Sequence, residues 1–342
     1  MYFIEKAKLN ELFAKISENS AVYLPVKKNG QVNFAKWEDG TEYCDELKTA
    51  KSAKDLFFPQ TENLMSFKKE GKKLSIDADE LPTERTVLFG VRACDAKSFK
   101  ILDSVFMSEP ADRFYTARRN NGIVITTACS LPEESCFCGV FGIDPSDPQA
   151  DSDIATWFVG DKLYWLAVTE KGESFTKEFE ELFSNGDSAE VEAEKERICE
   201  ITKALPLGGM SLDAFGGDKT EALFNAPQWD KLSEACLGCG SCTFVCPTCQ
   251  CYDVRDYDTG NGVQRYRCWD SCMYHDFTLM AHGTPRPTQK QRFRQRFMHK
   301  LVYFPANNNG EFSCVGCGRC VTRCPISMNI AKVIKSFGGD KK

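Results

Sequence analysis

The sequence predicts an α+β protein made of two parts with different character. The N-terminal part alternates short apolar strands with helical segments, whereas the part beyond Trp229 is dense in Cys, Gly and Arg. Charge changes at the same place, because 16 Lys and Arg stand against 8 Asp and Glu from Lys231 onward although the whole chain has a net charge of −6. We therefore expect a mixed α/β domain over residues 1–204, a linker over 205–225 and an α-helical domain with an insertion over 226–342.

Composition limits the class of protein. A chain of 342 residues is long enough to bury more than one core. Its 18 cysteines follow an N-terminus without a charged and then apolar leader, which favours a reducing cytoplasm over a secreted disulfide protein. Apolar runs stay well below the roughly 18 residues of a membrane span, and the mean hydropathy is negative. We expect a cytoplasmic protein without membrane contact.

The first elements of the N-terminal part suggest a sheet with a site along one edge. Helical spacing runs from Ile4 to Ile16, and residues 21–37 read as two strands around an Asn-Gly turn. Residues 86–91 (TVLFGV) form a short apolar strand that leads to Cys94 and a helix, and residues 123–127 (IVITT) lead likewise to Cys129. Cysteines at the carboxyl ends of two strands predict a site at that edge of an α/β layer.

The remainder of this part is more polar. A hairpin is expected at 157–168, followed by helices at 175–183 and 190–203. The run LPLGGMSLDAFGGD over 205–218 is rich in glycine and lacks periodicity, so it is expected to lie in the linker.

A repeated cysteine motif dominates the C-terminal part. Cys236-LG-Cys239-GS-Cys242-TFV-Cys246-Pro and Cys314-VG-Cys317-GR-Cys320-VTR-Cys324-Pro both read CxxCxxCxxxCP. This spacing is typical of two-cluster ferredoxins, in which the fourth cysteine of each run ligates the other 4Fe-4S cluster. The predicted ligands are Cys236, Cys239, Cys242 and Cys324 for one cluster and Cys314, Cys317, Cys320 and Cys246 for the other. The fold expected here is an α-helical, two-cluster ferredoxin-like domain.

The alternative for this repeat is a pair of zinc knuckles. Zinc sites also use CxxC pairs, but they need four ligands with a longer gap between the two pairs. Two four-cysteine runs, each closed by Cys-Pro, favour clusters. Glycines between the cysteines are expected to leave room for backbone N–H groups that point at inorganic sulfide.

Four further cysteines lie between the two motifs. Cys249 and Cys251 occur in CPTCQCYDV, and Cys268 and Cys272 occur in RYRCWDSCM, so four thiols could hold another cluster. They are candidate additional ligands, although small apolar thiols that pack beside a cluster would also account for them.

Four cysteines of the N-terminal part form another candidate site. Cys94 and Cys129 follow strands, whereas Cys136 and Cys138 lie in one loop as CFC. They could converge on a third 4Fe-4S cluster, and a zinc site or core thiols are the alternatives that remain open.

Motifs for nucleotide and flavin binding are missing. The sequence contains neither GxGxxG after a strand nor GxxxxGK[ST]. Its only histidines are His275, His282 and His299, and none lies in a catalytic motif. We expect no catalytic residues, and therefore an electron carrier and not a complete enzyme.

A basic segment over Arg286–Lys300 (RPTQKQRFRQRFMHK) has helical spacing of its aromatic residues. We interpret Arg292, Arg294 and Arg296 as residues that compensate cluster charge and dock an acidic partner. Two alternatives stay open. The segment could bind nucleic acid phosphates, or it could be a solvated helix face.

Together these blocks resemble a known family. GVRACDAKSFKILD, ACSLPEESCFC, CPTCQCYDV, WDSC, RPTQKQRFRQRF and CVGCGRC are similar to the beta subunit of sulfhydrogenase-type NiFe hydrogenases and to the corresponding iron-sulfur protein of anaerobic sulfite reductase, over nearly the whole chain. One departure is Cys268, which stands before WDSC where a basic residue is expected. It puts a four-cysteine site in the insertion in doubt.

The resemblance implies an electron-transfer subunit of a cytoplasmic, anaerobic oxidoreductase complex. Such a subunit passes electrons between an NAD(P)H-linked flavoprotein and a catalytic subunit, either a NiFe hydrogenase or sulfur reductase or a sirohaem sulfite reductase. Electron input to a heterodisulfide-reductase-type complex is the alternative within this class. A cluster-stabilised nucleic-acid-binding protein and a self-contained reductase are the alternatives from other classes.

Overall fold

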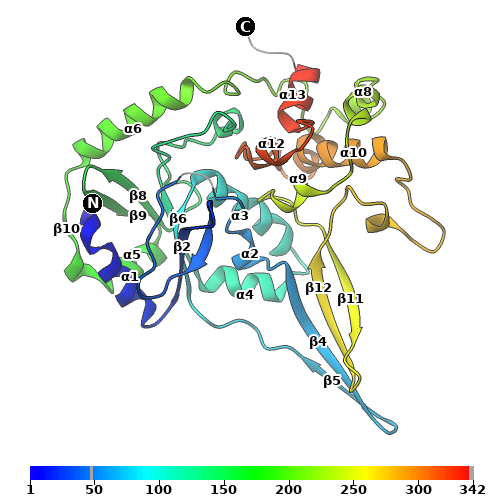
Figure 1. The fold of residues 1–342 in the computed structure, drawn as a ribbon, viewed down its shortest axis with the longest axis horizontal. Coiled ribbons are helices and arrows are strands. Elements are labelled where there is room, and N and C mark those ends of the chain that lie inside the picture. The colour runs from blue at the N-terminus through cyan, green and yellow to red at the C-terminus, as the bar shows by residue number, and fades with distance from the viewer. Residues whose placement is uncertain (47–48, 339–342) are drawn as a thin grey trace.

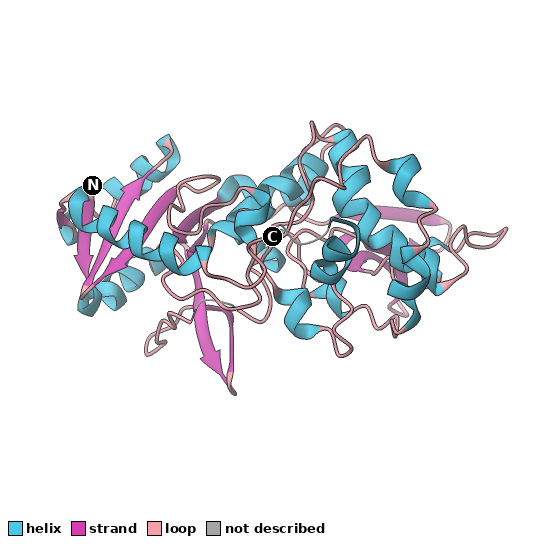
Figure 2. Ribbon diagram, turned by 90° about the horizontal axis from the view of Figure 1, so that it is seen from above, coloured by secondary structure: helices cyan, strands magenta, loops and turns pink. Residues whose placement is uncertain are grey.

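The structure, a computed structural model, describes residues 1–46 and 49–338 and has a strand-rich half and a helical half. Figure 2 shows the strands of the large sheet on one side and most helices of the C-terminal part on the other. The protein is therefore α+β, as the sequence predicts. The two halves are in extensive contact. A buried charge network joins them, and residues of both halves line one cavity.

The strand-rich half is built on an eight-stranded mixed sheet with the order β10-β1-β9-β8-β7-β6-β2-β3. Its central strands β2, β6, β7 and β8 are parallel to one another, and the flanking strands are antiparallel. In chain order the strands are β1 (Tyr2–Glu5), β2 (Ala21–Lys28), β3 (Gln31–Lys36), β6 (Thr86–Val91), β7 (Gly122–Thr127), β8 (Ile154–Val159), β9 (Lys162–Ala167) and β10 (Ser184–Asn185).

Helices cover both faces of this sheet because its central strands are apolar on both faces. Phe89 and Ile125 pack with α1 and α5 on one face, while Leu88 and Val124 pack with α2, α3 and α4 on the other. The alternation follows the two-residue period of a strand. The helices are α1 (Leu9–Ser17), α2 (Lys54–Phe57), α3 (Ala93–Phe106), α4 (Arg113–Asn121), α5 (Glu170–Lys177) and α6 (Ser188–Lys203).

Most expected elements of this half are confirmed, and two are displaced. The hairpins at 21–37 and 157–168, the strands before Cys94 and Cys129, and the helix at 190–203 are present. The helix expected from Ile4 starts only at Leu9, because residues 2–5 pair with β9 and bury Ile4 in the core. The helix expected at 175–183 lies at 170–177, where Thr169 caps its first turn.

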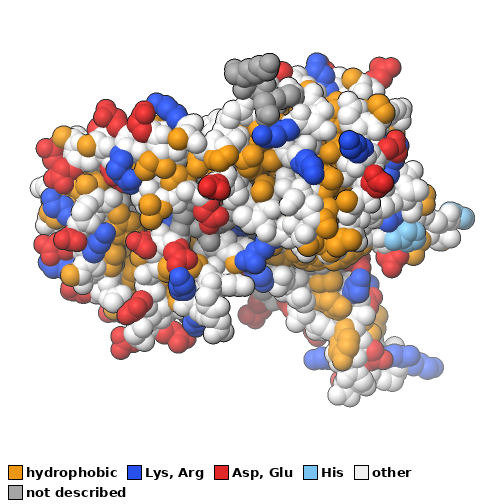
Figure 3. Space-filling view, turned by 45° about the horizontal axis from the view of Figure 1, so that its top comes forward, with side chains coloured by type: hydrophobic (Ala, Val, Ile, Leu, Met, Phe, Trp, Pro, Cys, Tyr) orange, Lys and Arg blue, Asp and Glu red, His pale blue; other side chains and the backbone are white. Residues whose placement is uncertain are grey.

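A four-stranded arm projects from the body, and the sequence patterns do not predict it. Its order is β11-β12-β4-β5, with β4 (Thr61–Glu70), β5 (Lys73–Ala78), β11 (Tyr252–Asp258) and β12 (Val263–Trp269). Figure 1 shows these strands extending away from both halves, and in Figure 3 the arm is the protrusion at the lower right. The arm thus combines two hairpins that lie far apart in the sequence.

A buried charge network fixes the base of this arm. Arg267 of β12 is 2% exposed and forms ion pairs with Glu62 of β4 and with Asp112, the N-cap of α4. Arg118 of α4 pairs with the same Glu62. A hairpin from the predicted C-terminal domain is therefore joined by hydrogen bonds and buried charges to the predicted domain 1–204. The sheet of the arm contains strands from both sides of the proposed domain boundary, so this boundary describes the sequence and does not separate two structural units.

The C-terminal half is mainly helical around its own apolar core. Trp229, Phe293, Phe297 and Leu301 are buried in this core. The segment 205–218 contains no helix or strand, whereas the remainder of the predicted linker 205–225 includes the short helix α7. The helices are α7 (Thr220–Phe224), α8 (Gln228–Glu234), α9 (Ser241–Phe244), α10 (Gln289–Met298), the π-helical turn η5 (His299–Tyr303), α11 (Phe304–Asn307), α12 (Arg319–Arg323) and α13 (Ile330–Gly338).

Within the described ranges, no helix has both the length and the apolar character needed to cross a bilayer.

Candidate iron-sulfur sites

The first thiol group surrounds a cavity in the helical half. Its members, called the first motif group, are Cys236, Cys239, Cys242 and Cys324. The fourth comes from the second motif, so the chain brings it across as the crossing rule predicts. Apolar side chains such as Phe293 and Met273 complete the wall, and Cys239 is exposed. This group therefore lies close to the surface.

The second motif group lies deeper. It consists of Cys246, Cys314, Cys317 and Cys320, and the thiols of Cys246 and Cys320 interact electrostatically with both of the other two. Burial raises the pKa of Cys317 to about 12. A buried thiol of this kind ionises near neutral pH where a strong positive charge, such as the iron of a cluster, would stabilise the thiolate.

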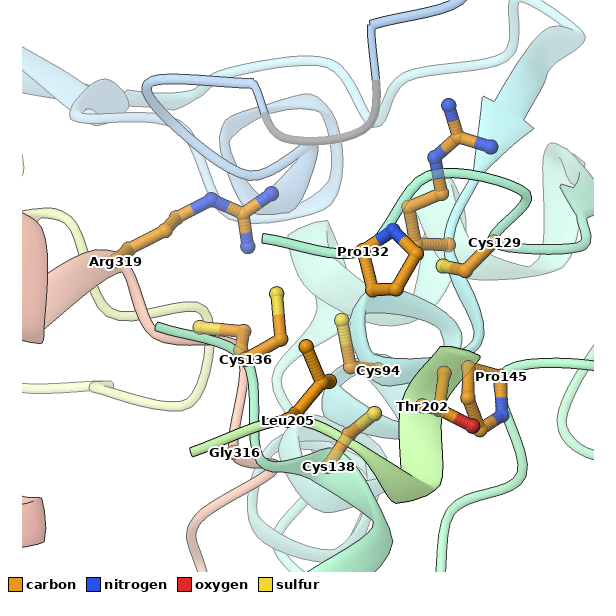
Figure 4. A pocket seen from close by; sticks show the side chains of 12 residues that line it. Cys94, Cys129, Pro132, Cys136, Cys138, Pro145, Thr202, Leu205, Gly316 and Arg319 are labelled. Carbon is orange, nitrogen blue, oxygen red and sulfur yellow. The ribbon is translucent and has the colours of Figure 1, made fainter. Parts of the chain in front are cut away.

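The four N-terminal cysteines converge on one cavity. Cys94 lies in the first turn of α3, and Cys129 follows β7. Cys136 lies in the loop before the 3₁₀ turn η2 (Cys138–Phe141), and Cys138 is the first residue of that turn. Figure 4 shows their sulfur atoms around a common space at the carboxyl edge of the parallel strands. We call them the N-terminal thiol group. The structure brings these four thiols to one cavity.

This cavity suits a group held by thiolates. Its wall contains apolar side chains, including Pro132, Pro145 and Leu205, and no carboxylate or histidine. Burial raises the pKa of Cys129 to about 12 and that of Cys94 well above its usual value. In the described part of the chain, no three Cys, His, Asp or Glu side chains are placed to hold a single metal ion.

The second motif forms one wall of the N-terminal cavity. Cys317, Gly316 and Arg319 line it together with the four cysteines. The backbone N–H of Phe137 donates to the carbonyl of Gly316 at 2.8 Å, and a Cβ on Gly316 would lie 2.4 Å from the carbonyl oxygen of Phe137. Only glycine permits this approach, and its φ of 60° is in the left-handed region. Close packing against Phe137 is therefore a reason for glycine at position 316 that is independent of the expected approach to inorganic sulfide.

A buried ion pair holds the same junction. Arg319 of α12 donates from both terminal nitrogens to the two carboxylate oxygens of Asp95, each at 2.6 Å, and its Nε donates to the carbonyl of Thr49 at 2.9 Å. Arg319 is 2% exposed and Asp95 is 1% exposed. Because Arg319 also lies near Cys317 and Cys94, this bidentate pair connects the second motif group to the N-terminal thiol group.

These contacts place the three thiol groups in a row. Cys94 and Cys317 interact across the junction between the N-terminal and second groups, and Cys242 interacts with Cys320 and Cys246 between the first and second groups. The second motif group is therefore the middle one. A row of neighbouring redox sites, with one end near the surface, is the geometry that single-electron transfer requires.

The candidate ligands in the insertion lie beside the second motif group without forming a separate four-thiol site. Cys249 shares a hydrogen bond with Cys246, and Cys251 shares one with Cys272, which lowers the pKa of Cys251 to about 7. Cys268 interacts with Arg255 and Asp253 on the arm, away from these thiols. The structure thus brings together two pairs and leaves out Cys268.

The basic segment forms helix α10, capped by Thr288 and Gln291, but not one uniform docking face. Arg294 stacks on Phe224 at 3.6 Å, and Arg292 donates to the carbonyls of Met273, Arg286 and Pro287. Arg296 is 2% exposed and turned toward the thiols. Its predicted role in partner docking is therefore wrong, since the amphipathic pattern directs this arginine into the core with Phe293 and Phe297.

Two buried lysines near the second motif group are missing from the sequence-based predictions. Lys54 donates to the carbonyls of Cys246 and Cys249 at 3.1 and 2.9 Å and lies over the ring of Trp269 at 3.7 Å. Lys300 donates to Thr248 at 2.7 Å and to the carbonyl of Ser313 at 3.0 Å. Lys54 lies in no motif, and a single lysine before DLFFP gives no sign of burial. Lys300 could have been found from its place one turn after Arg296 on the apolar face of the helix.

Comparison with known proteins agrees with this arrangement. Residues 235–328 match the model of a family described as a 4Fe-4S dicluster domain, and this match includes both cysteine motifs. The whole chain is 33% identical over 331 residues to the beta subunit of sulfhydrogenase 2 from Pyrococcus furiosus, covering 95% of this chain and 94% of that protein. No solved structure matches the chain. The chain belongs to the 4Fe-4S dicluster electron-transfer subunit family that includes this sulfhydrogenase beta subunit.

Proposed function

We propose that this chain is the iron-sulfur electron-transfer subunit of an oxidoreductase complex. In this role it carries single electrons between an NAD(P)H-linked flavoprotein subunit and a catalytic subunit that reduces protons, sulfur or sulfite. The observation that carries the proposal is the row of three thiol groups, which begins at the N-terminal cavity and ends at the partly exposed Cys239. The relative's name supports a hydrogenase complex over the other assemblies.

The proposed ligands follow the three groups. Cys236, Cys239, Cys242 and Cys324 would hold one 4Fe-4S cluster, and Cys246, Cys314, Cys317 and Cys320 a second. Cys94, Cys129, Cys136 and Cys138 would hold a third, because these four thiols line one cavity, to whose described wall only Cys317, proposed as a ligand of the second cluster, adds another metal-binding side chain. Cys249, Cys251 and Cys272 are proposed as surrounding thiols and not as ligands of a fourth cluster, since they lie in two hydrogen-bonded pairs.

A partner flavin and a partner active site would supply the two-electron chemistry, and clusters held by the three thiol groups would supply single-electron transfer between them. This chain's own residues exclude water and hold each cluster in a defined place. Phe293 and Phe297 shield the first motif group, while the Arg319–Asp95 pair fixes the distance between the second and N-terminal groups. No proton transfer by this chain is needed.

Iron and sulfide analysis of the anaerobically purified chain tests the cofactor content. Three clusters correspond to about 12 iron atoms per chain and two clusters to about eight. A content near eight would restrict the proposal to the dicluster part, and a content well below eight would contradict it. The number of signals in the EPR spectrum of the reduced protein checks the count independently.

Partner reduction tests the function itself. The purified chain should accept electrons from a reduced flavoprotein and pass them to a hydrogenase or sulfite reductase subunit, but should not oxidise NAD(P)H alone. Unaided turnover of NAD(P)H with sulfite or sulfur would instead identify a self-contained reductase. Retention of nucleic acid at physiological salt would favour the binding-protein alternative, which the bound or buried state of Arg292, Arg294 and Arg296 makes unfavourable.

A further inference from the structure

Arg296 has an unusual environment for an arginine. It is 2% exposed, and its single hydrogen bond among the described residues runs from Nη2 to the carbonyl of Cys242 at 3.0 Å. Its Nε and Nη1 are buried without any hydrogen-bond partner in the described part of the chain. The guanidinium also lies 4.6 Å from the ring of Phe297, which holds it in place from one side. A buried cation with unused donors needs an acceptor nearby.

The neighbours of this guanidinium are thiols from two different groups. It lines the cavity of the first motif group, and it interacts electrostatically with Cys242 of that group and with Cys320 and Cys246 of the second. Burial opposes its charge, but these thiols together raise the pKa of Arg296 well above its usual value. The side chain is therefore a permanent cation placed between two sets of proposed cluster ligands.

The other buried cations of this region each have more hydrogen-bond partners among the described residues than Arg296 has. Arg319 pairs with Asp95 through two hydrogen bonds, and Lys300 donates to Thr248 and to the carbonyl of Ser313. No carboxylate among the described residues forms an ion pair with Arg296. Its full charge and two of its donor nitrogens are therefore directed at the thiol groups.

A charge in this position acts on redox equilibria. A cluster with four thiolate ligands is anionic, and reduction adds one further negative charge. A nearby buried cation stabilises the reduced form more than the oxidised form, since Coulomb interactions are strong where water is excluded. A cation between two clusters therefore raises both potentials.

We propose that Arg296 is a positioning residue that the first and second motif groups share, and that its charge raises the reduction potentials of both clusters. This inference rests on the proposed function, because it requires clusters in both groups. It assigns to Arg296 an internal electrostatic role in place of partner docking. It also explains why helix α10 turns one arginine inward while Arg294, on the same helix, stacks on Phe224.

The test uses the full-length, cluster-loaded chain with the variants Arg296→Gln, Arg296→Lys and Arg294→Gln. Gln retains a donor but removes the charge, Lys retains the charge, and Arg294→Gln removes a charge of the same helix on its other side. Redox titration monitored by EPR gives the midpoint potentials. We expect Arg296→Gln to lower the midpoint potentials of the clusters in the first and second motif groups by about 59 mV each. This shift corresponds to a tenfold change in a one-electron equilibrium. Arg296→Lys should restore most of the shift, and Arg294→Gln should leave the potentials unchanged.

Each outcome decides the proposal. Full iron content with unchanged potentials in Arg296→Gln would overturn it. If Arg296→Gln loses iron and Arg296→Lys keeps it, charge compensation is required for cluster binding and the proposal is supported. If both variants lose iron, the shape of the side chain matters and its charge does not, so the proposal fails. Absence of clusters from the unmutated chain would instead contradict the proposed function.

Discussion

The two motif groups and the N-terminal thiol group bring four cysteines together by different routes. In the motif groups, three of four cysteines lie within seven residues, and a single backbone turn brings them together. In the N-terminal group, Cys94 and Cys129 are held at the ends of neighbouring parallel strands, and the loop carrying Cys136 and Cys138 closes over them. One kind of site is encoded locally, and the other is assembled by the tertiary fold.

The difference has a consequence for stability. The N-terminal group stands on a sheet with large apolar clusters on both faces, so its scaffold is folded by hydrophobic burial. The motif loops contribute mainly half-buried thiols and glycines, and their order depends on the metal that they bind. The following predictions test this difference between the two kinds of site.

Removal of iron should have the largest effect, and it should affect the two kinds of site unequally. With a chelator under reducing conditions, we expect amide protection to be lost in the loops 236–246 and 314–324 but retained in β6 and β7, because only the loops depend on metal for their order. Hydrogen-exchange mass spectrometry measures this. A uniform loss of protection across both halves would show that the sheet also depends on the clusters.

Single cysteine replacements should remove one cluster each. Cys236→Ala and Cys94→Ala are both expected to lower the iron content by about four atoms per chain, while the secondary structure of the sheet remains. Iron analysis and circular dichroism provide the measurement. Cys268→Ala is the matched control, because Cys268 lies outside all three groups, and it should bind as much iron as the unmutated chain. Unchanged iron in Cys94→Ala would remove the third cluster from the proposal.

Loss of the Arg319–Asp95 ion pair, which joins the second motif group to the N-terminal thiol group, should lower the free energy of unfolding by about 3–5 kcal/mol. The change Arg319→Met leaves the Asp95 carboxylate buried without its partner, and this uncompensated charge is the source of the loss. Urea unfolding monitored by fluorescence measures it. The exposed Arg323 of the same helix offers a control, since Arg323→Met should change stability by less than about 1 kcal/mol. Equal effects of the two variants would argue against a special role of the junction.

Loss of the helix cap should have the smallest effect. Thr288 accepts a hydrogen bond from the backbone N–H of Gln291 and forms a capping box at the start of α10. We expect Thr288→Ala to destabilise the protein by about 1 kcal/mol, because one N–H of the first turn loses its acceptor. Thr288→Ser keeps the hydroxyl and should be close to neutral in the same denaturation experiment. A Ser variant as unstable as the Ala variant would assign the effect to the lost methyl group.

The sequence predicts contacts that follow from a motif spacing or from parallel strands, and it does not predict other long-range pairings. The crossing of Cys324 to the first motif group follows from a spacing rule, and the meeting of Cys94 with Cys129 follows from parallel strands. The arm could not be predicted, since β4 and β12 are polar strands whose pairing is not encoded in either segment alone. The docking role predicted for Arg296 is wrong because its charge suggests exposure, whereas its position on the helix decides burial.

The arm also constrains the order in which the chain becomes a folded protein. Gln264 donates to the carbonyl of Met65, and these two residues are 199 positions apart. During synthesis, β4 leaves the ribosome long before β12 exists, so one of its edges waits unpaired and open to association with other chains. Contacts of such high sequence separation also slow folding. We therefore expect the nascent N-terminal half to require protection from aggregation until β12 has been made.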